Sequence, residues 1–279
     1  MLNSRVLLII ASIALAVSLY FLPIKPLKMK ESEKEAKAEQ VEETQQAFDA
    51  EAYFSEKKAS LEGSIQDSFE LLQSKIDQSR DNFALVDQMA TFCYRNKAPF
   101  LGAQFEKRKI ELTDSVDALQ QIGDRLIRTS YLENADPGAK LYFSNAAINA
   151  YSKALENTDR VDIKVRLASA YMDGTNQVMN GVTLLLEVLD QEPKNLDANL
   201  ILGRYGIISG QYEKALGRLN TVIEQDSGIA EAYLYRAEAL NALGKSQEAI
   251  DDFEKCKELL DNPQLEKEID VFIEGLKNT

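Results

Sequence analysis

The sequence repeats one pattern at a fixed spacing in its last third. Gly210 and Gly244 lie 34 residues apart, and Ala215 and Ala249 have the same separation. A period of roughly 20–50 residues is typical of repeat proteins, in which each unit packs mainly on its neighbours. The spacing therefore favours an open stack of small units over a single closed core.

Apolar and small residues at helical spacing precede each of these glycines. The stretch from Asn199 to Tyr205 reads NLILGRY, and the stretch from Tyr233 to Leu240 reads YLYRAEAL. A glycine that ends such a stretch and an alanine five residues later are typical of a helix–turn–helix unit. The pattern resembles the tetratricopeptide repeat family, and this resemblance implies an all-α solenoid of stacked helical hairpins.

The resemblance covers residues 81–263 and is strongest over residues 161–260. Pro193 stands where the family places a proline after its second helix, because proline ends a helix. The turn Asp173–Asn176 is longer than the family pattern, and Gly181 replaces the usual alanine. The expected units are residues 81–114, 115–160, 161–195, 196–229 and 230–263.

Other positions also depart from the family pattern. Arg236 replaces the usual leucine of the last unit, and Ser227 replaces the usual proline. The turn signal Asn134–Gly138 lies within extra residues of the unit 115–160, so we expect both helices of that unit to be longer. Asp251 and Asp252 are expected to lie on an exposed helix face, with Lys255 one turn away.

An uncharged apolar run lies near the start of the chain, from Val6 to Ile24. A helix of about 19 residues would cross the roughly 30 Å core of a bilayer. We expect residues 1–27 to form an uncleaved transmembrane anchor. The alternative is a signal peptide cut near Ala14–Ala16, but the apolar run continues past this point, whereas cleavage sites usually precede polar sequence.

The next segment, residues 28–60, is rich in Glu, Lys, Gln and Ala, which predicts a charged helical linker or stalk. A dimeric coiled coil is the alternative, although Val41, Phe48 and Tyr53 are too sparse for apolar heptads. Residues 61–80 are expected to form a leading helix, and residues 264–279 an amphipathic capping helix. We expect a single-pass protein of a bacterial inner membrane, with the repeats on its outer side.

Composition excludes several classes of function. The chain has no histidine, which removes the commonest general base and metal ligand. Its net charge of −13 argues against binding to nucleic acid, which needs clustered Lys and Arg. Cys93 and Cys256 fit neither a disulfide framework nor a metal site, so we expect both to be small buried side chains. We expect no catalytic site, no metal site and no cofactor.

The family resemblance implies a ligand groove along the first helix of each repeat. The pattern of lysines and asparagines that clamps a carboxylate in some members is absent, and Arg204 is the single cation in the set. A mixed apolar and acidic groove favours a hydrophobic or basic peptide. The expected groove residues are Asp162, Val165, Ser169, Met172, Asp197, Leu200, Arg204, Ile207, Glu231, Leu234, Glu238 and Asn241.

The predicted function is therefore a non-catalytic, membrane-anchored scaffold that binds a peptide or protein segment. Its expected partners are another polypeptide and, through residues 6–24, the membrane. Two alternatives stay open at this point. The repeats could self-associate into a structural homo-oligomer, or the domain could be an accessory subunit that docks onto a membrane enzyme complex.

Overall fold

A computed structural model describes residues 48–132, 136–260 and 262–277. The expected membrane anchor and residues 28–47 of the expected linker lie outside these residues. Every regular element within the described ranges is helical, which confirms the all-α prediction for this part of the chain. None of the helices described there is long and apolar enough to cross a bilayer. The described residues form two compact units, 48–185 and 186–277.

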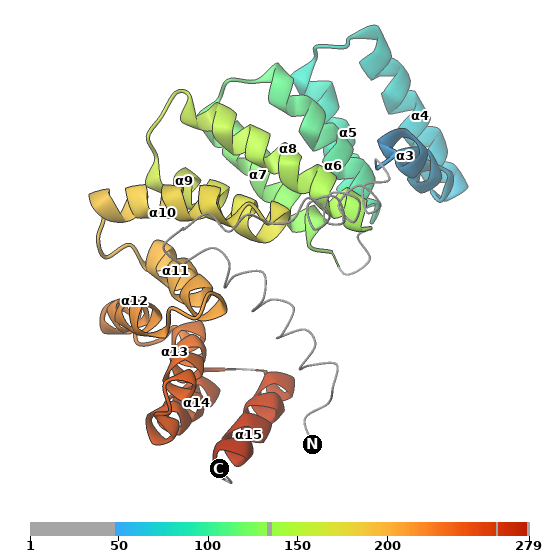
Figure 1. Ribbon diagram of the computed structural model, residues 1–279. Coiled ribbons are helices and arrows are strands. Elements are labelled where there is room, and N and C mark those ends of the chain that lie inside the picture. Colours follow the sequence, from blue (N-terminus) through green and yellow to red (C-terminus); the bar gives the residue numbers. More distant parts are fainter. Residues whose placement is uncertain (1–47, 133–135, 261, 278–279) are drawn as a thin grey trace, which may run out of the picture. The chain divides into compact units, whose positions relative to one another are not determined.

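The first unit contains two leading helices followed by successive hairpins (Figure 1). α5 pairs with α6 and α7 pairs with α8, while α4 packs on α5 and α6 packs on α7. Its helices are α3 (Ala50–Ala59), α4 (Gly63–Gln78), α5 (Phe83–Arg95), α6 (Pro99–Lys109), α7 (Val116–Ser130), α8 (Pro137–Leu155) and α9 (Val161–Ser169). A short 3-10 turn, Ile110–Leu112, follows α6.

The second unit repeats the same arrangement (Figure 1). α11 pairs with α12 and α13 pairs with α14, while α12 packs on α13 and α14 packs on α15. Its helices are α11 (Leu196–Ile208), α12 (Tyr212–Gln225), α13 (Ala230–Ala242), α14 (Ser246–Leu259) and α15 (Pro263–Lys277). α10 (Val178–Gln191) precedes α11 and crosses the boundary between the units.

Local sequence explains where the helices begin and end. The side chains of Asn82, Ser115 and Asn195 each accept a hydrogen bond from a backbone N–H of the first turn that follows, which satisfies a donor with no partner inside the helix. Gly210 and Gly244 have φ angles of 72° and 76°. Glycine adopts this left-handed conformation without steric cost, so the 34-residue spacing marks two equivalent turns.

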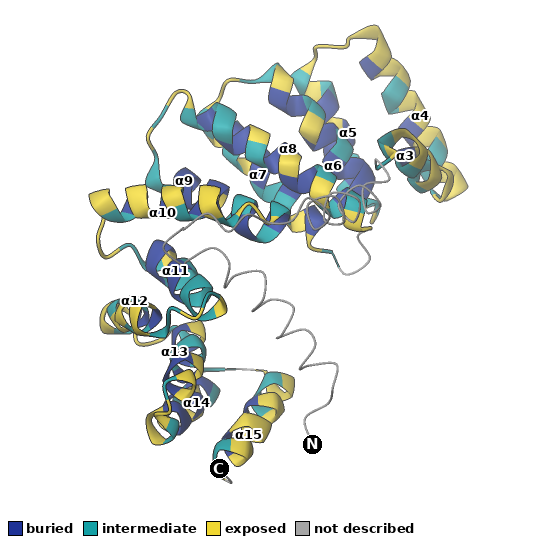
Figure 2. Cartoon of the chain, in the orientation of Figure 1, coloured by how far each residue is buried: buried dark blue, intermediate teal, exposed yellow. Residues whose placement is uncertain are grey.

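Glycine and alanine allow the two helices of a hairpin to lie close together. A Cβ atom built at Gly123 of α7 would lie 2.4 Å from Cε1 of Tyr151 on α8. A Cβ atom at Gly203 of α11 would lie 2.9 Å from Cδ2 of Leu219 on α12. The buried faces in Figure 2 follow these contacts between helices. Ala215 and Ala249, on the second helices of their hairpins, are completely buried.

The end of the expected linker belongs to the core. α3 packs on α6, and Phe54 is 5% exposed. The Phe54 ring lies edge-on to Phe143 at a centroid distance of 6.0 Å, while the Tyr53 ring lies edge-on to Phe100 at 5.8 Å. This differs from the stalk expected through residue 60. The aromatic side chains of this segment follow no heptad, yet they are large enough to bind a short charged helix to the core.

The unit 161–195 contains an irregular first helix. α9 ends at Ser169 and continues as a π-helical turn, Ala170–Gly174. An extra residue in a π-helical turn shifts the side chains that follow it around the helix axis. Met172 consequently points inward, and a Cβ atom at Gly181 would lie 2.2 Å from its Cγ. The π-helical turn therefore accounts for the longer turn Asp173–Asn176, and the inward position of Met172 accounts for glycine at position 181.

The C-terminal helix differs in part from a solvated cap. Ile269 and Ile273 of α15 are buried, as its amphipathic pattern predicts. Phe272, next to buried Ile273, is 62% exposed and lies over Phe253 at a centroid distance of 6.0 Å. Figure 2 shows that most of α15 is exposed.

The cysteine prediction is confirmed, whereas the prediction for Asp252 is wrong. Cys93 and Cys256 are buried free thiols, and burial raises the pKa of Cys93 to about 12. Asp252 is 6% exposed, and its two carboxylate oxygens accept hydrogen bonds from Nε and Nη2 of Arg236 at 2.7 Å each. Lys255 instead pairs with Glu258. Arg236, which replaces the usual leucine of the last unit, is thus paired with the buried carboxylate of Asp252.

A pair of glycine substitutions tests the close contact between helices. Gly123→Ala should reduce the free energy of unfolding by about 1–3 kcal/mol, because the new methyl group would overlap the buried Tyr151 ring. Gly217→Ala is the matched control, since no atom lies within 4 Å of its Cβ position in α12. Alanine there should stabilise the helix by about 0.5–1 kcal/mol. Urea unfolding measures both, and equal effects would contradict this packing.

A second pair of variants tests the ion pair between α13 and α14. Arg236→Leu restores the family residue but leaves the Asp252 carboxylate buried without its partner. We expect a loss of about 3 kcal/mol, at the low end for a broken buried ion pair, because Arg236 is partly exposed. The double variant Arg236→Leu with Asp252→Ala should recover at least half of this loss in thermal unfolding. A stable single variant would show that the pair contributes nothing.

Candidate functional site

The first helices of the two C-terminal hairpins carry most of the expected groove residues. α11 and α13 contact each other directly. Leu200, Ile207 and Leu234 are half-buried, and they occupy the face predicted for the groove. Ile208, four residues after Arg204, continues this face and is 43% exposed. The structure thus brings apolar side chains from two adjacent helices to an accessible surface.

Polar side chains surround these apolar residues. Asp197, Glu231, Glu238 and Asn241 are exposed. Loss of solvent around Glu238 raises the pKa of its carboxyl group, although its surface stays accessible. The guanidinium of half-buried Arg204 lies over the Tyr205 ring, 5.0 Å from its centroid. We call the surface formed by these residues together with Leu200, Ile207, Ile208 and Leu234 the α11–α13 face.

The expected groove residues of the preceding repeat are placed differently. Val165 and Met172 are buried, and Ser169 is half-buried. Asp162 is exposed but accepts hydrogen bonds from Arg160, which also contacts Asp117. The hydrogen bonds from Arg160 lower the pKa of the Asp162 carboxyl group. These four residues therefore form no open apolar surface.

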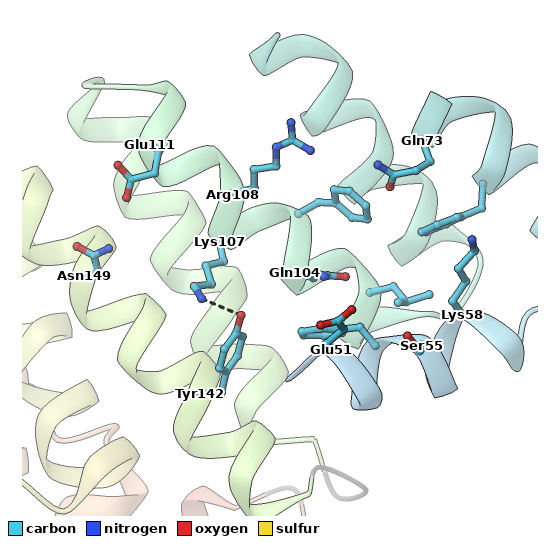
Figure 3. A pocket seen from close by; sticks show the side chains of 14 residues that line it. Glu51, Ser55, Lys58, Gln73, Gln104, Lys107, Arg108, Glu111, Tyr142 and Asn149 are labelled. Carbon is cyan, nitrogen blue, oxygen red and sulfur yellow. Dashed lines mark hydrogen bonds between the residues drawn. The ribbon is translucent and has the colours of Figure 1, made fainter. Parts of the chain in front are cut away.

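The first unit has a hollow that the sequence did not reveal. It has a volume of about 570 Å3 and lies along the outer side of α6, between α4 and α8, with α3 at one end (Figure 3). Its lining residues are Glu51, Phe54, Ser55, Lys58, Phe69, Gln73, Leu101, Gln104, Phe105, Lys107, Arg108, Glu111, Tyr142 and Asn149. The sequence pattern does not indicate this hollow, because α3, at one end of it, has the composition of a charged linker. We call it the α6 hollow.

A buried ionic cluster joins the helices on the other side of α6. Glu106 is 0% exposed, and its carboxylate lies 2.7 Å from Arg125 of α7 and 2.9 Å from Lys109. Lys109 donates a further hydrogen bond of 2.6 Å to Asp87 of α5. The hydrogen bond to Glu106 raises the pKa of Arg125. Because each buried charge faces an opposite one, the cluster fixes the relative positions of α5, α6 and α7.

Potential metal ligands and nucleophiles lie in separate places in the part of the chain that the structure describes. No group of three or more His, Cys, Asp or Glu side chains there could hold a metal ion. The buried thiol of Cys93 is a poor nucleophile, because burial disfavours its thiolate.

Comparison with known proteins gives one match to a sequence family. The sequence profile described as tetratricopeptide repeat matches residues 209–258. No curated protein sequence is significantly similar to the chain.

Comparison with solved structures gives matches of low sequence identity. YrrB, a TPR protein with an unusual peptide-binding site, is 15% identical with a TM-score of 0.47, and the match covers 71% of this chain and 96% of YrrB. MamA from Desulfovibrio magneticus RS-1 is 17% identical with a TM-score of 0.49, covering 63% and 94%. PilW, a widely conserved type IV pilus biogenesis factor, is 14% identical with a TM-score of 0.47, covering 68% and 84%.

The family match coincides with the hairpins that carry the clearest sequence pattern. It includes α12, α13 and most of α14, together with the left-handed glycines Gly210 and Gly244. Residues 209–258 are therefore the part of the chain that matches the tetratricopeptide repeat profile.

Proposed function

We propose that the protein is a non-catalytic scaffold that binds a segment of another polypeptide on the α11–α13 face. The observation that carries this proposal is the alignment of Leu200, Ile207, Ile208 and Leu234 on adjacent helices within a polar rim. Binding surfaces of proteins commonly combine an apolar centre with a charged edge. The scaffold itself needs no rearrangement to present this surface.

The charges around the face define the ligand that it would prefer. Asp197, Glu231 and Glu238 contribute carboxylates, while Arg204 contributes the single cation of the predicted set. A segment with apolar side chains and basic neighbours would complement this arrangement. Most of the affinity would come from a few apolar side chains buried between α11 and α13, and the rim would select by charge.

Photo-crosslinking in cells tests the α11–α13 face. A benzophenone side chain at Ile208 or Asn241 should form covalent adducts with a small set of polypeptides, whereas one at exposed Glu224 of α12 should not. Glu238→Lys should reduce the adduct yield about fivefold without lowering the melting temperature, because it reverses an exposed charge that the basic neighbours of the bound segment would meet. Equal adducts at Glu224, or yields unaffected by Glu238→Lys, would contradict the proposal. An adduct of two copies of this chain would indicate self-association instead.

Membrane attachment is the second part of the proposal, and it depends on the sequence of residues 6–24. Attachment there would raise the concentration of the binding face near membrane partners. The chain should sediment with membranes after alkaline carbonate washing and be released by detergent. Ile13→Arg with Ala16→Arg should move it to the supernatant, because two charges oppose insertion of this segment. A shortened chain in the soluble fraction would instead support the signal-peptide alternative.

A further inference from the structure

The α6 hollow is built from regular helix faces and not from loops. α6 contributes Leu101, Gln104 and Arg108, which follow helical spacing along one side, and the 3-10 turn after it contributes Glu111. α3 also contributes one helix face, which carries Glu51, Phe54, Ser55 and Lys58. Helical walls keep their positions, so the hollow exists before any ligand binds. None of its lining residues comes from α5, α7, α11 or α13, which makes it separate from the α11–α13 face.

Cations at the wall of this hollow lack carboxylate partners. Lys107 donates a hydrogen bond of 2.7 Å to the hydroxyl of Tyr142 and lies 4.1 Å from the centroid of its ring. Arg108 donates to the backbone oxygen of Arg80 at 2.7 Å. Within the described residues, neither Lys107 nor Arg108 lies within ion-pair distance of a carboxylate. Figure 3 shows Lys107 directed at Tyr142 along the hollow.

Carboxylates also line the hollow, so its positive character is confined to the wall that carries Lys107 and Arg108. Lys58 is matched by Glu70 at 3.4 Å, outside the lining. Glu51 and Glu111 are exposed and lie on different walls of the hollow. In a chain with a net charge of −13, a hollow with two uncompensated cations is suited to an anionic group.

Aromatic and aliphatic side chains form the floor. Phe54, Phe69, Leu101 and Phe105 line the hollow, and each is at most 6% exposed. An apolar group that enters the hollow would contact these side chains and displace water from them. The amides of Gln73, Gln104 and Asn149 at its sides can donate to and accept from a peptide backbone.

We propose that the α6 hollow binds an acidic segment of another polypeptide, with one apolar side chain on the aromatic floor. Lys107 and Arg108 pair with carboxylates of that segment, and Tyr142 holds Lys107 in position. Nucleic acid fits less well, because its phosphate backbone needs Lys and Arg clustered over a longer surface, and the chain has a net charge of −13. This second face prefers acidic ligands, whereas the α11–α13 face prefers basic ones, so one chain can hold two different segments.

Fluorescence anisotropy with a labelled acidic peptide, EEFEELEE, and the full chain tests this proposal. Lys107→Gln with Arg108→Gln should weaken binding about tenfold, because two ion pairs are lost. Lys75→Gln with Arg95→Gln is the charge-matched control, since both residues are exposed and do not line the hollow, and it should change the affinity by less than about twofold. The peptide EEAEEAEE should bind more weakly, and KKFKKLKK should not bind.

A steric variant separates binding from folding. Gln104→Trp fills the hollow without changing any charge, and it should abolish binding of EEFEELEE while the melting temperature stays near that of the unaltered chain. Equal losses in the two charge variants, or tight binding to Gln104→Trp, would overturn the proposal. So would failure of the full chain to bind the peptide. Binding that appears only after Glu33, Glu35 and Glu39 are changed to Gln would assign the hollow to this chain's own acidic segment, against a separate partner.

Discussion

The close approach of the two helices in each hairpin is the constraint on which the rest of the structure depends. Gly123 against Tyr151 and Gly203 against Leu219 are the clearest cases, because no side chain fits at either glycine. With the helices this close, a hairpin has a narrow core and must bury its remaining apolar side against its neighbours. The surfaces at α6 and at α11 with α13 follow from this stacking, since the outward sides of the helices keep residues that no neighbour covers.

The repeat architecture could be predicted from a small number of residues. Gly210 and Gly244 have φ angles that favour glycine, and Ala215 and Ala249 lie at buried positions, so their 34-residue spacing identifies two equivalent hairpins. The surface on α11 and α13 was predictable for the same reason, because both helices are regular and their outward positions follow a constant period. The burial of Met172 was less predictable, because the π-helical turn moves the residues after Ser169 around the axis, and such a turn has no clear signature in one sequence. Val165 lies in the regular helix before this turn, so the turn does not explain its burial.

Features that depend on tertiary pairing could not be read from local patterns. Asp251 next to Asp252 and Lys255 one turn away indicate an exposed helix face. Arg236 from the preceding helix instead pairs with the Asp252 carboxylate, which makes its burial possible. α3 has the composition of a solvated helix, yet Phe54 and Tyr53 find aromatic partners on α6 and α8 that lie far away in sequence. The α6 hollow needs both α3 and α6, so it appears only when the packing of α3 is known.

Helical hairpins stack in both units of the chain, and we propose two binding surfaces on them, one mixed apolar and acidic and the other aromatic and basic. The proposed function requires that α11 and α13 together receive a polypeptide. Hydrogen–deuterium exchange of the full chain, alone and with a polypeptide captured at Ile208, measures this contact. We expect slower exchange in Leu196–Ile208 and Ala230–Ala242 in the complex, with little change in Tyr212–Gln225. Unchanged exchange in both first helices, with protection confined to other parts of the chain, would contradict it.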